Sequence, residues 1–153
     1  MQITRQADYA VRAVLYLAEI NGDGRAPTSR IAEDMKIPPS FLAKIVSQLS
    51  VAGVLATSRG ARGGVALARA PGEISLLEVI EAIDGPITLN ECVPDRSACV
   101  FGKGCPVHDV WCQAQSDLVA RLQQTSHQRT ADEERSPNYE DVHWIRRARA
   151  RWS

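Results

Sequence analysis

Hydrophobic residues recur every three or four positions in the first third of the chain, which is the spacing of an amphipathic helix. Three helices are predicted from this spacing, over residues 4–20, 28–35 and 39–52. Thr4 is placed to cap the first helix, Thr28 or Ser29 opens the second, and Gly53 ends the third. The apolar face of the third helix is predicted to contain Phe41, Leu42, Ile45, Val46 and Leu49.

After Gly53 the hydrophobic positions alternate, as they do in a strand that is buried on one face. Residues 54–58 and 64–68 form two such runs around a glycine-rich turn, which predicts a β-hairpin. Two further helices are expected, one over 76–84 after the capping residue Ser75 and one from Pro106 to about Gln124. The predicted fold is mostly α with a small β-hairpin, in the element order of a winged helix-turn-helix domain followed by a long helix.

These elements divide the chain into three expected parts. Residues 1–85 form the winged helix-turn-helix domain, 86–125 hold a cysteine-bearing loop and the long helix, and 126–153 form a polar C-terminal tail. The tail carries runs of charged residues, for which no function is predicted.

Composition places the chain among ordinary soluble globular proteins, because hydrophobic residues make up 44% and charged residues 24%. The net charge is zero, so a surface that binds nucleic acid has to be local. No apolar run approaches the roughly 20 residues that span a bilayer, and the N-terminus lacks a signal-peptide pattern. We therefore expect a cytoplasmic protein without a membrane partner.

Polar and basic side chains suited to DNA lie on the third helix and at the hairpin turn. In a helix-turn-helix the second helix of the motif enters the major groove, where short polar and basic groups reach phosphates and base edges. Ser40, Lys44 and Gln48 occupy the predicted outer face of this helix, and Arg59 and Arg62 flank the tip of the hairpin. These five residues are the candidate DNA-binding residues.

The four cysteines all lie between positions 92 and 112. In a reducing compartment such a cluster indicates metal binding or redox chemistry in preference to disulfides. Thiolates are suited to both iron–sulfur clusters and zinc, and Cys92, Cys99 and Cys105 with His108 form a complete tetrahedral ligand set for zinc. Structural zinc sites usually contain two cysteines two to four residues apart, whereas the gaps here are six and five residues. The residues alone leave both kinds of site open.

Several motifs resemble the Rrf-type family of bacterial winged helix-turn-helix transcriptional regulators, which includes the IscR-like and NsrR-like iron–sulfur regulators. The matching motifs span roughly residues 1–125 and include Thr4-x3-Asp8-Tyr9-Ala10-Val11-Arg12, Arg59-Gly60-x2-Gly63-Gly64 and Pro71-x2-Ile74-Ser75-Leu76. The resemblance implies a homodimer joined by the long helix after the cysteine loop, a palindromic DNA operator, and an iron–sulfur cluster held by the loop cysteines. Ala43 departs from the family, whose iron–sulfur regulators often have a glutamate there, so the preferred DNA sequence is not predicted.

Three residues compete as the fourth cluster ligand. Cys105-x2-His108 resembles the regulators with a [2Fe–2S] cluster, in which an imidazole would raise the reduction potential. Asp8 occupies the position from which the nitric-oxide sensors donate a carboxylate across the dimer to a [4Fe–4S] cluster. Cys112 lies one helical turn after His108. The favoured set is Cys92, Cys99, Cys105 and His108 with a [2Fe–2S] cluster, and a [4Fe–4S] cluster with Asp8 is the alternative.

The resulting hypothesis is a DNA-binding transcriptional regulator, not an enzyme, whose operator binding is controlled by a cluster that senses redox, iron or nitric oxide status. A zinc-stabilised DNA-binding regulator without cluster sensing is the alternative. A redox enzyme has little support, because the chain contains no glycine-rich nucleotide-binding loop.

Overall fold

The computed structural model describes residues 2–20, 24–60, 63–101 and 104–127. Its first helix, α1 (Arg5–Glu19), begins at Thr4, whose hydroxyl accepts a hydrogen bond from the Ala7 amide. Helices α2 (Thr28–Asp34) and α3 (Pro39–Val51) follow and form the helix-turn-helix. The expected side-chain cap of α2 is absent, because the helix begins after Pro27, with Thr28 as its first residue. All three helices lie within two residues of the predicted bounds.

The β-hairpin consists of β1 (Leu55–Ser58) and β2 (Gly64–Leu67), which pair in antiparallel register from Leu55 opposite Leu67 to Ser58 opposite Gly64. We call this hairpin the wing. Ala26, from the segment between α1 and α2, forms an isolated antiparallel bridge with Val65 through two backbone hydrogen bonds. Gly64 permits this contact, because a Cβ there would lie 2.8 Å from the Ala26 carbonyl oxygen.

The main core fills the space between α1, α2, α3, the wing and α4 (Leu76–Asp84). Leu17, Ile31, Ile45, Leu49 and Val79 are among the side chains that are fully buried there. Phe41 is a correction to the predicted apolar face of α3: its ring is 44% exposed and meets only the edge of Tyr9, with ring centroids 6.0 Å apart.

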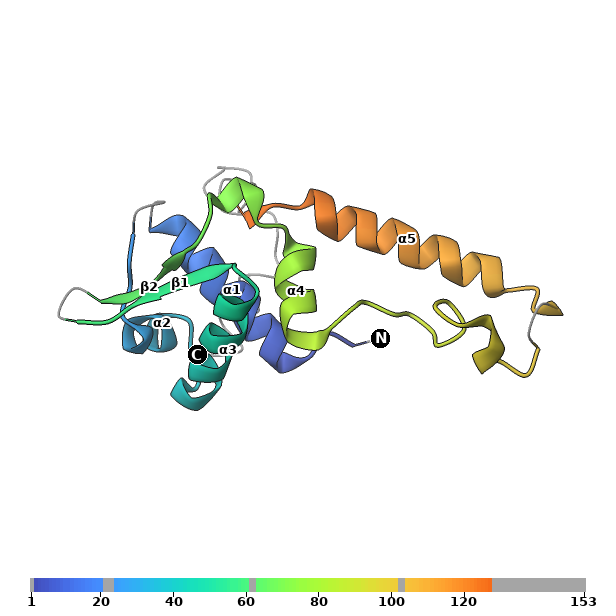
Figure 1. Cartoon of the computed structure of the whole chain (residues 1–153), viewed down its shortest axis with the longest axis horizontal. Helices are drawn as coiled ribbons and strands as arrows, with labels where there is room; N and C mark the ends of the chain where they lie inside the picture. The colour runs from blue at the N-terminus through green and yellow to red at the C-terminus, as the bar shows by residue number, and fades with distance from the viewer. Residues whose placement is uncertain (1, 21–23, 61–62, 102–103, 128–153) are drawn as a thin grey trace, which may run out of the picture.

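The last described helix, α5 (His108–Gln124), extends away from the rest of the fold (Figure 1). Its second half packs on α4 through a small apolar cluster of Leu77, Ile80, Ile87, Leu118, Val119 and Leu122. Its first half, with the loop between α4 and α5, projects from the domain. None of the described helices is both long and apolar enough to cross a membrane.

The chain after α5 returns to the domain. Ser126 pairs with Ser75, and the amide of His127 donates to the Ile74 carbonyl oxygen at 3.1 Å. We expected a polar tail from residue 126 onward, but His127 is only 1% exposed. The remainder of the predicted tail, from 128 to 153, lies outside the described residues. The mostly α fold with one β-hairpin is confirmed.

Candidate functional site

The outer face of α3 presents polar side chains in the arrangement predicted for a DNA-reading helix. Ser40 and Lys44 are exposed, while Gln48 is half-buried. The opposite face of the helix packs into the core through Leu42, Ile45, Val46 and Leu49. Since the apolar face fixes the rotation of the helix about its axis, the polar face is held outward. No carboxylate of the described chain forms an ion pair with Lys44.

Gln48 has a partner that sequence reasoning missed. The Gln6 side-chain amide, from α1, donates a hydrogen bond to the Gln48 side-chain oxygen. With its oxygen engaged in this way, Gln48 has its NH2 group left as the donor for a further partner. Nothing in the sequence pattern signals this contact, because the two residues are 42 positions apart.

The wing presents Arg59 at the end of β1, where its side chain is exposed. Gly60 follows with φ 107°, a backbone conformation that side chains other than glycine rarely adopt. Arg62, the second arginine predicted to bind DNA, lies outside the described residues. Arg59 and the α3 residues therefore make up the candidate DNA-binding surface that the structure describes.

The cysteine loop between α4 and α5 contains a 3-10 turn, η2 (Arg96–Ala98). All four cysteines are free thiols; Cys92 is buried, and Cys99, Cys105 and Cys112 are half-buried. Within the described parts of the chain, no three His, Cys, Asp or Glu side chains gather closely enough to hold a metal ion. Cys92 and His108 do lie together, but the structure describes no contact that brings Cys99 or Cys105 to them.

His108 is the most constrained of the candidate ligands. Its ring is 7% exposed, and Nε2 lies 3.0 Å from the carbonyl oxygen of Cys92. Nδ1 lies 3.0 Å from Arg96 Nη2, which can only donate, and 3.2 Å from Asp109 Oδ1, which accepts only from a protonated Nδ1. A histidine that ligates a metal commonly donates its other ring N–H to a backbone carbonyl, and the Cys92 carbonyl lies where Nε2 can donate to it.

Arg96 is a residue of this site that sequence analysis did not select. Besides His108, its guanidinium donates to Asp109 Oδ1 at 3.1 Å, and it places a positive charge beside the imidazole. Arg96 lies in η2 and Asp109 in the first turn of α5, 13 positions later, and both are exposed. Only the folded loop brings them together.

The two other candidate fourth ligands lie in different surroundings. Cys112 lies one helical turn after His108 on α5, and its Sγ is 3.6 Å from the Nδ1 of His108. Asp8 lies on α1, is 48% exposed and forms an ion pair of 2.5 Å with Arg12 one turn later. The structure describes no contact between the Asp8 carboxylate and the cysteine loop of its own chain. A role for Asp8 as a ligand therefore requires a second copy of the chain.

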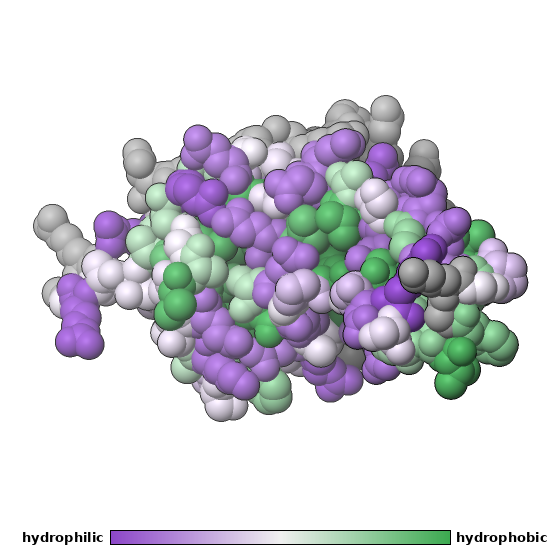
Figure 2. Space-filling view, turned by 45° about the vertical axis from the view of Figure 1, so that its right-hand side comes forward, coloured by the Kyte–Doolittle hydropathy of each residue, from purple (hydrophilic) through white to green (hydrophobic). Residues whose placement is uncertain are grey.

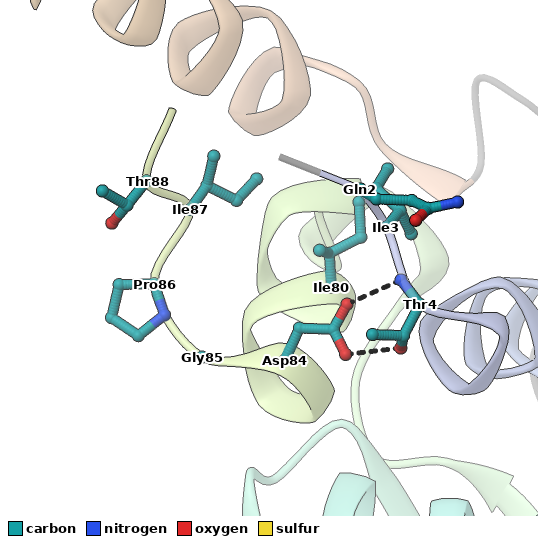
Figure 3. A pocket seen from close by; sticks show the side chains of 9 residues that line it. All are labelled: Gln2, Ile3, Thr4, Ile80, Asp84, Gly85, Pro86, Ile87 and Thr88. Atoms are coloured by element: carbon teal, nitrogen blue, oxygen red, sulfur yellow. Dashed lines mark hydrogen bonds between the residues drawn. The ribbon is translucent and has the colours of Figure 1, made fainter. Parts of the chain in front are cut away.

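A small open pocket of about 310 Å³ lies where the N-terminal segment meets the end of α4 (Figure 3). Asp84 accepts two hydrogen bonds from Thr4, one from the amide at 3.1 Å and one from the hydroxyl at 2.6 Å. Ile3, Ile80 and Ile87 supply the apolar part of the lining. The two hydrogen bonds between Thr4 and Asp84 tie the beginning of α1 to the end of α4, and the lining contains no cysteine or histidine.

Three comparisons with known proteins agree with this arrangement. A family model described as Rrf2, an iron-dependent transcriptional regulator, matches residues 3–133. The HTH-type transcriptional regulator IscR of Aliivibrio salmonicida is 34% identical over 122 residues, which are 80% of this chain and 70% of that protein. The regulator NsrR of Shouchella clausii is 29% identical over 81% of this chain and 84% of its own length. The structure of CymR, the global cysteine regulator of B. subtilis, aligns with a TM-score of 0.74 and 25% identity over 86% of this chain and 97% of its own.

Proposed function

Because the chain belongs to the Rrf2 family of transcriptional regulators, we propose that it binds operator DNA through α3 and the wing, under the control of an iron–sulfur cluster. The relatives and structural neighbours are transcriptional regulators and not enzymes. The proposal adds three specific points: which residues contact DNA, which residues hold the cluster, and how two copies of the chain assemble.

DNA contact is assigned to Ser40, Lys44 and Gln48 on α3 and to Arg59 and Arg62 on the wing. The helix enters the major groove, where Lys44 and Gln48 reach phosphates or base edges, while the wing arginines contact the adjacent minor groove or its phosphates. The exposure of Ser40, Lys44 and Arg59 on the described surface supports this assignment. The neutral overall charge fits a surface of this kind, because the basic groups are local.

The cluster is assigned to Cys92, Cys99, Cys105 and His108, and the geometry of His108 is the observation that carries this assignment. Three free thiols and a buried imidazole whose Nε2 lies 3.0 Å from the Cys92 carbonyl oxygen have the chemistry of a cluster ligand set. When bound, the cluster would supply the redox or nitrosylation chemistry through which iron, redox or nitric oxide status is sensed. Arg96 would lose its bond to Nδ1 and remain beside the site as a compensating positive charge.

We assign the interface of a homodimer to the first half of α5. Val107, Val110 and Trp111 are 50%, 64% and 40% exposed at the beginning of this helix. Figure 2, in which this end of the molecule comes forward, shows hydrophobic side chains at the surface among polar ones. Two copies paired along α5 would present two α3 helices to a palindromic operator whose half-sites are about 34–36 Å apart.

Control of DNA binding follows from the position of the loop. It connects α4, which is packed in the DNA-binding domain, to α5, which is the proposed dimer helix. A change in how the loop is held would alter the spacing of the two α3 helices and so the fraction of dimers that fits the operator. A coupling of about 1–3 kcal/mol is sufficient to change affinity roughly 5- to 150-fold.

Anaerobic purification with absorption spectra and with iron and sulfide counts tests the cluster assignment. We expect the wild-type protein to be coloured and to contain iron and acid-labile sulfide in equal amounts, and Cys99→Ala to contain neither. Cys112→Ala removes a thiol outside the favoured ligand set and should leave the iron content unchanged; a loss of iron in this variant would assign Cys112 as the fourth ligand.

The fourth ligand is identified by comparing His108→Ala with Asp8→Ala in the same measurements. A changed spectrum in the first variant alone assigns His108, and a change in the second alone assigns Asp8. A colourless wild-type protein that contains zinc and no sulfide would contradict the cluster assignment and leave a zinc-stabilised regulator.

A further inference from the structure

Arg25, in the segment between α1 and α2, lies beside the wing although sequence analysis placed no function there. Its guanidinium Nη1 donates a hydrogen bond to the hydroxyl of Ser58. Ser58 is the last residue of β1 and directly precedes Arg59. Arg25 is thus held next to a residue already assigned to DNA contact, from a segment about 30 positions earlier in the chain.

The backbone holds this position independently of the side chain. Ala26, the next residue, exchanges two hydrogen bonds with Val65 of β2, at 3.0 and 2.9 Å. Because Gly64 leaves no room for a Cβ against the Ala26 carbonyl, the backbone at Ala26 is packed tightly against β2. Arg25 therefore lies directly before a residue that is bridged to the two-stranded wing.

The electrostatic surroundings of Arg25 differ from those of several other arginines. Within the described part of the chain, neither Arg25 nor Arg59 forms an ion pair with a carboxylate. Four other arginines do form such pairs with Asp or Glu: Arg12, Arg30, Arg69 and Arg96. A guanidinium has five N–H donors, so the bond to one hydroxyl leaves Arg25 able to bind a further acceptor.

We propose that Arg25 is an additional phosphate-binding residue of the wing, positioned by Ser58 and acting with Arg59 on the DNA backbone. The proposal rests on the DNA-binding function proposed above and extends it to a residue outside the helix-turn-helix and the hairpin. A phosphate contact contributes affinity without sequence preference, so Arg25 would help to orient the wing on any DNA sequence.

The test is the salt dependence of binding to a fluorescein-labelled random-sequence duplex, followed by fluorescence anisotropy between 50 and 200 mM KCl, with full-length protein. The slope of log K against log salt is negative, and each phosphate contact contributes about −0.9 to it. We expect Arg25→Ala to reduce the magnitude of the slope by about 0.9 for each bound protomer. At 0.1 M salt this is about an eight-fold weaker binding per protomer. Arg25→Lys keeps the charge and should keep the slope.

Arg121→Ala is the matched control, because it removes one exposed positive charge from α5, an element outside the helix-turn-helix and the wing. Its slope should equal that of the wild type. Ser58→Ala should keep the wild-type slope and weaken binding less than Arg25→Ala does. Thermal melting followed by circular dichroism establishes that each variant folds.

This experiment distinguishes a failure of the Arg25 proposal from a failure of the proposed DNA-binding function. If the wild type binds the duplex and folded Arg25→Ala has the wild-type slope, the proposal for Arg25 is overturned and the DNA-binding function stands. If the wild type shows no binding at 50 mM KCl, both are overturned.

Discussion

The DNA-binding half and the cysteine-loop half of the molecule are held together in different ways. The first, from α1 to α4, has a continuous apolar core in which Leu17, Ile45 and Leu49 are almost completely buried. In the second, the described residues from 89 to 124 contain only two buried side chains, those of Cys92 and His108. The first half encloses a core of its own, whereas in the second half Val107, Val110 and Trp111 are exposed and only Cys92 and His108 among the candidate ligands are buried.

This difference indicates where each half obtains its stability. Burial of apolar area stabilises the first half within a single chain, at roughly 25 cal/mol per Å². The loop is held by a few polar contacts around His108 and by the packing of the second half of α5 on α4. A second copy of the chain would cover the exposed apolar side chains of this half, and a metal cluster would bind its thiols. Both additions would stabilise the loop, which is consistent with the proposed function.

The largest effect is expected from a cavity in the first half. Leu49→Ala removes a fully buried side chain from α3, and we expect a loss of about 3–4 kcal/mol in the free energy of unfolding. Urea denaturation followed by circular dichroism measures this loss. Val51 lies two residues later on the same helix and is 89% exposed, so Val51→Ala should change the free energy of unfolding by less than about 0.5 kcal/mol. Equal effects of the two substitutions would contradict the packing described for α3.

A somewhat smaller effect is expected from a charge on the exposed side of α5. Val110→Asp should weaken dimerisation by about 2–3 kcal/mol, roughly 100-fold in the dimer dissociation constant, because a dimer axis places the substitution in the interface twice. Sedimentation velocity over a concentration series measures the constant. Ser116→Asp is the control, since 100° per residue places Ser116 about 120° around the helix from Val110 and about 180° from Val107. If Val110→Asp has the dimer dissociation constant of the wild type, the first half of α5 does not form the interface.

The two halves also differ in how far the sequence predicted them. Helices α1, α3 and α4 and the wing were predicted within two residues, because periodicity and caps such as Thr4 and Ser75 are local signals. The exposure of Phe41 was not predicted, because the position of a residue at the margin of an apolar face depends on the neighbouring helices.

The contacts that define the second half are between residues far apart in sequence. Arg96, in a loop without periodicity, contacts His108 and Asp109 at the beginning of α5, and the pairing of Ser126 with Ser75 joins segments 51 positions apart. The cysteines could be selected from residue type and from the expected reducing compartment. Their approach to one another could not be predicted: in the described structure the Cys92 carbonyl and the Cys112 thiol lie beside His108.

His127 allows the junction between the two halves to be tested by pH. Its Nδ1 donates to the Ile74 carbonyl at 3.0 Å, while Nε2 is buried without a hydrogen-bond partner in the described structure. Burial lowers the pKa of His127, and the Ile74 carbonyl and the negative charge of Glu78 oppose this effect only in part. The neutral ring is therefore the form that fits the folded chain.

The sign of the pH effect follows from this lowered pKa. The unfolded chain takes up the proton first, near its ordinary value of about 6.5, so stability is complete above that pH and is lost as the pH falls through it. Urea denaturation at pH 7.5 and 5.5 measures how much the free energy of unfolding changes between the two pH values. This change should be smaller for His127→Gln, whose side chain does not titrate, than for the wild type. The same difference in both proteins would show that His127 does not cause the pH dependence.

The smallest expected effect is a gain in stability within the packed half. Lys36, in the turn between α2 and α3, is the one described non-glycine residue with positive φ, at 54°. A lysine there costs free energy that a glycine would not, so Lys36→Gly should stabilise the protein by about 0.5–1 kcal/mol. Lys36→Ala is the control, because it loses the same side chain and keeps the strained backbone. If the packed half determines unfolding, thermal melting should rise by a few degrees for Lys36→Gly alone. Equal shifts in both variants would assign the gain to the removed side chain and not to the backbone.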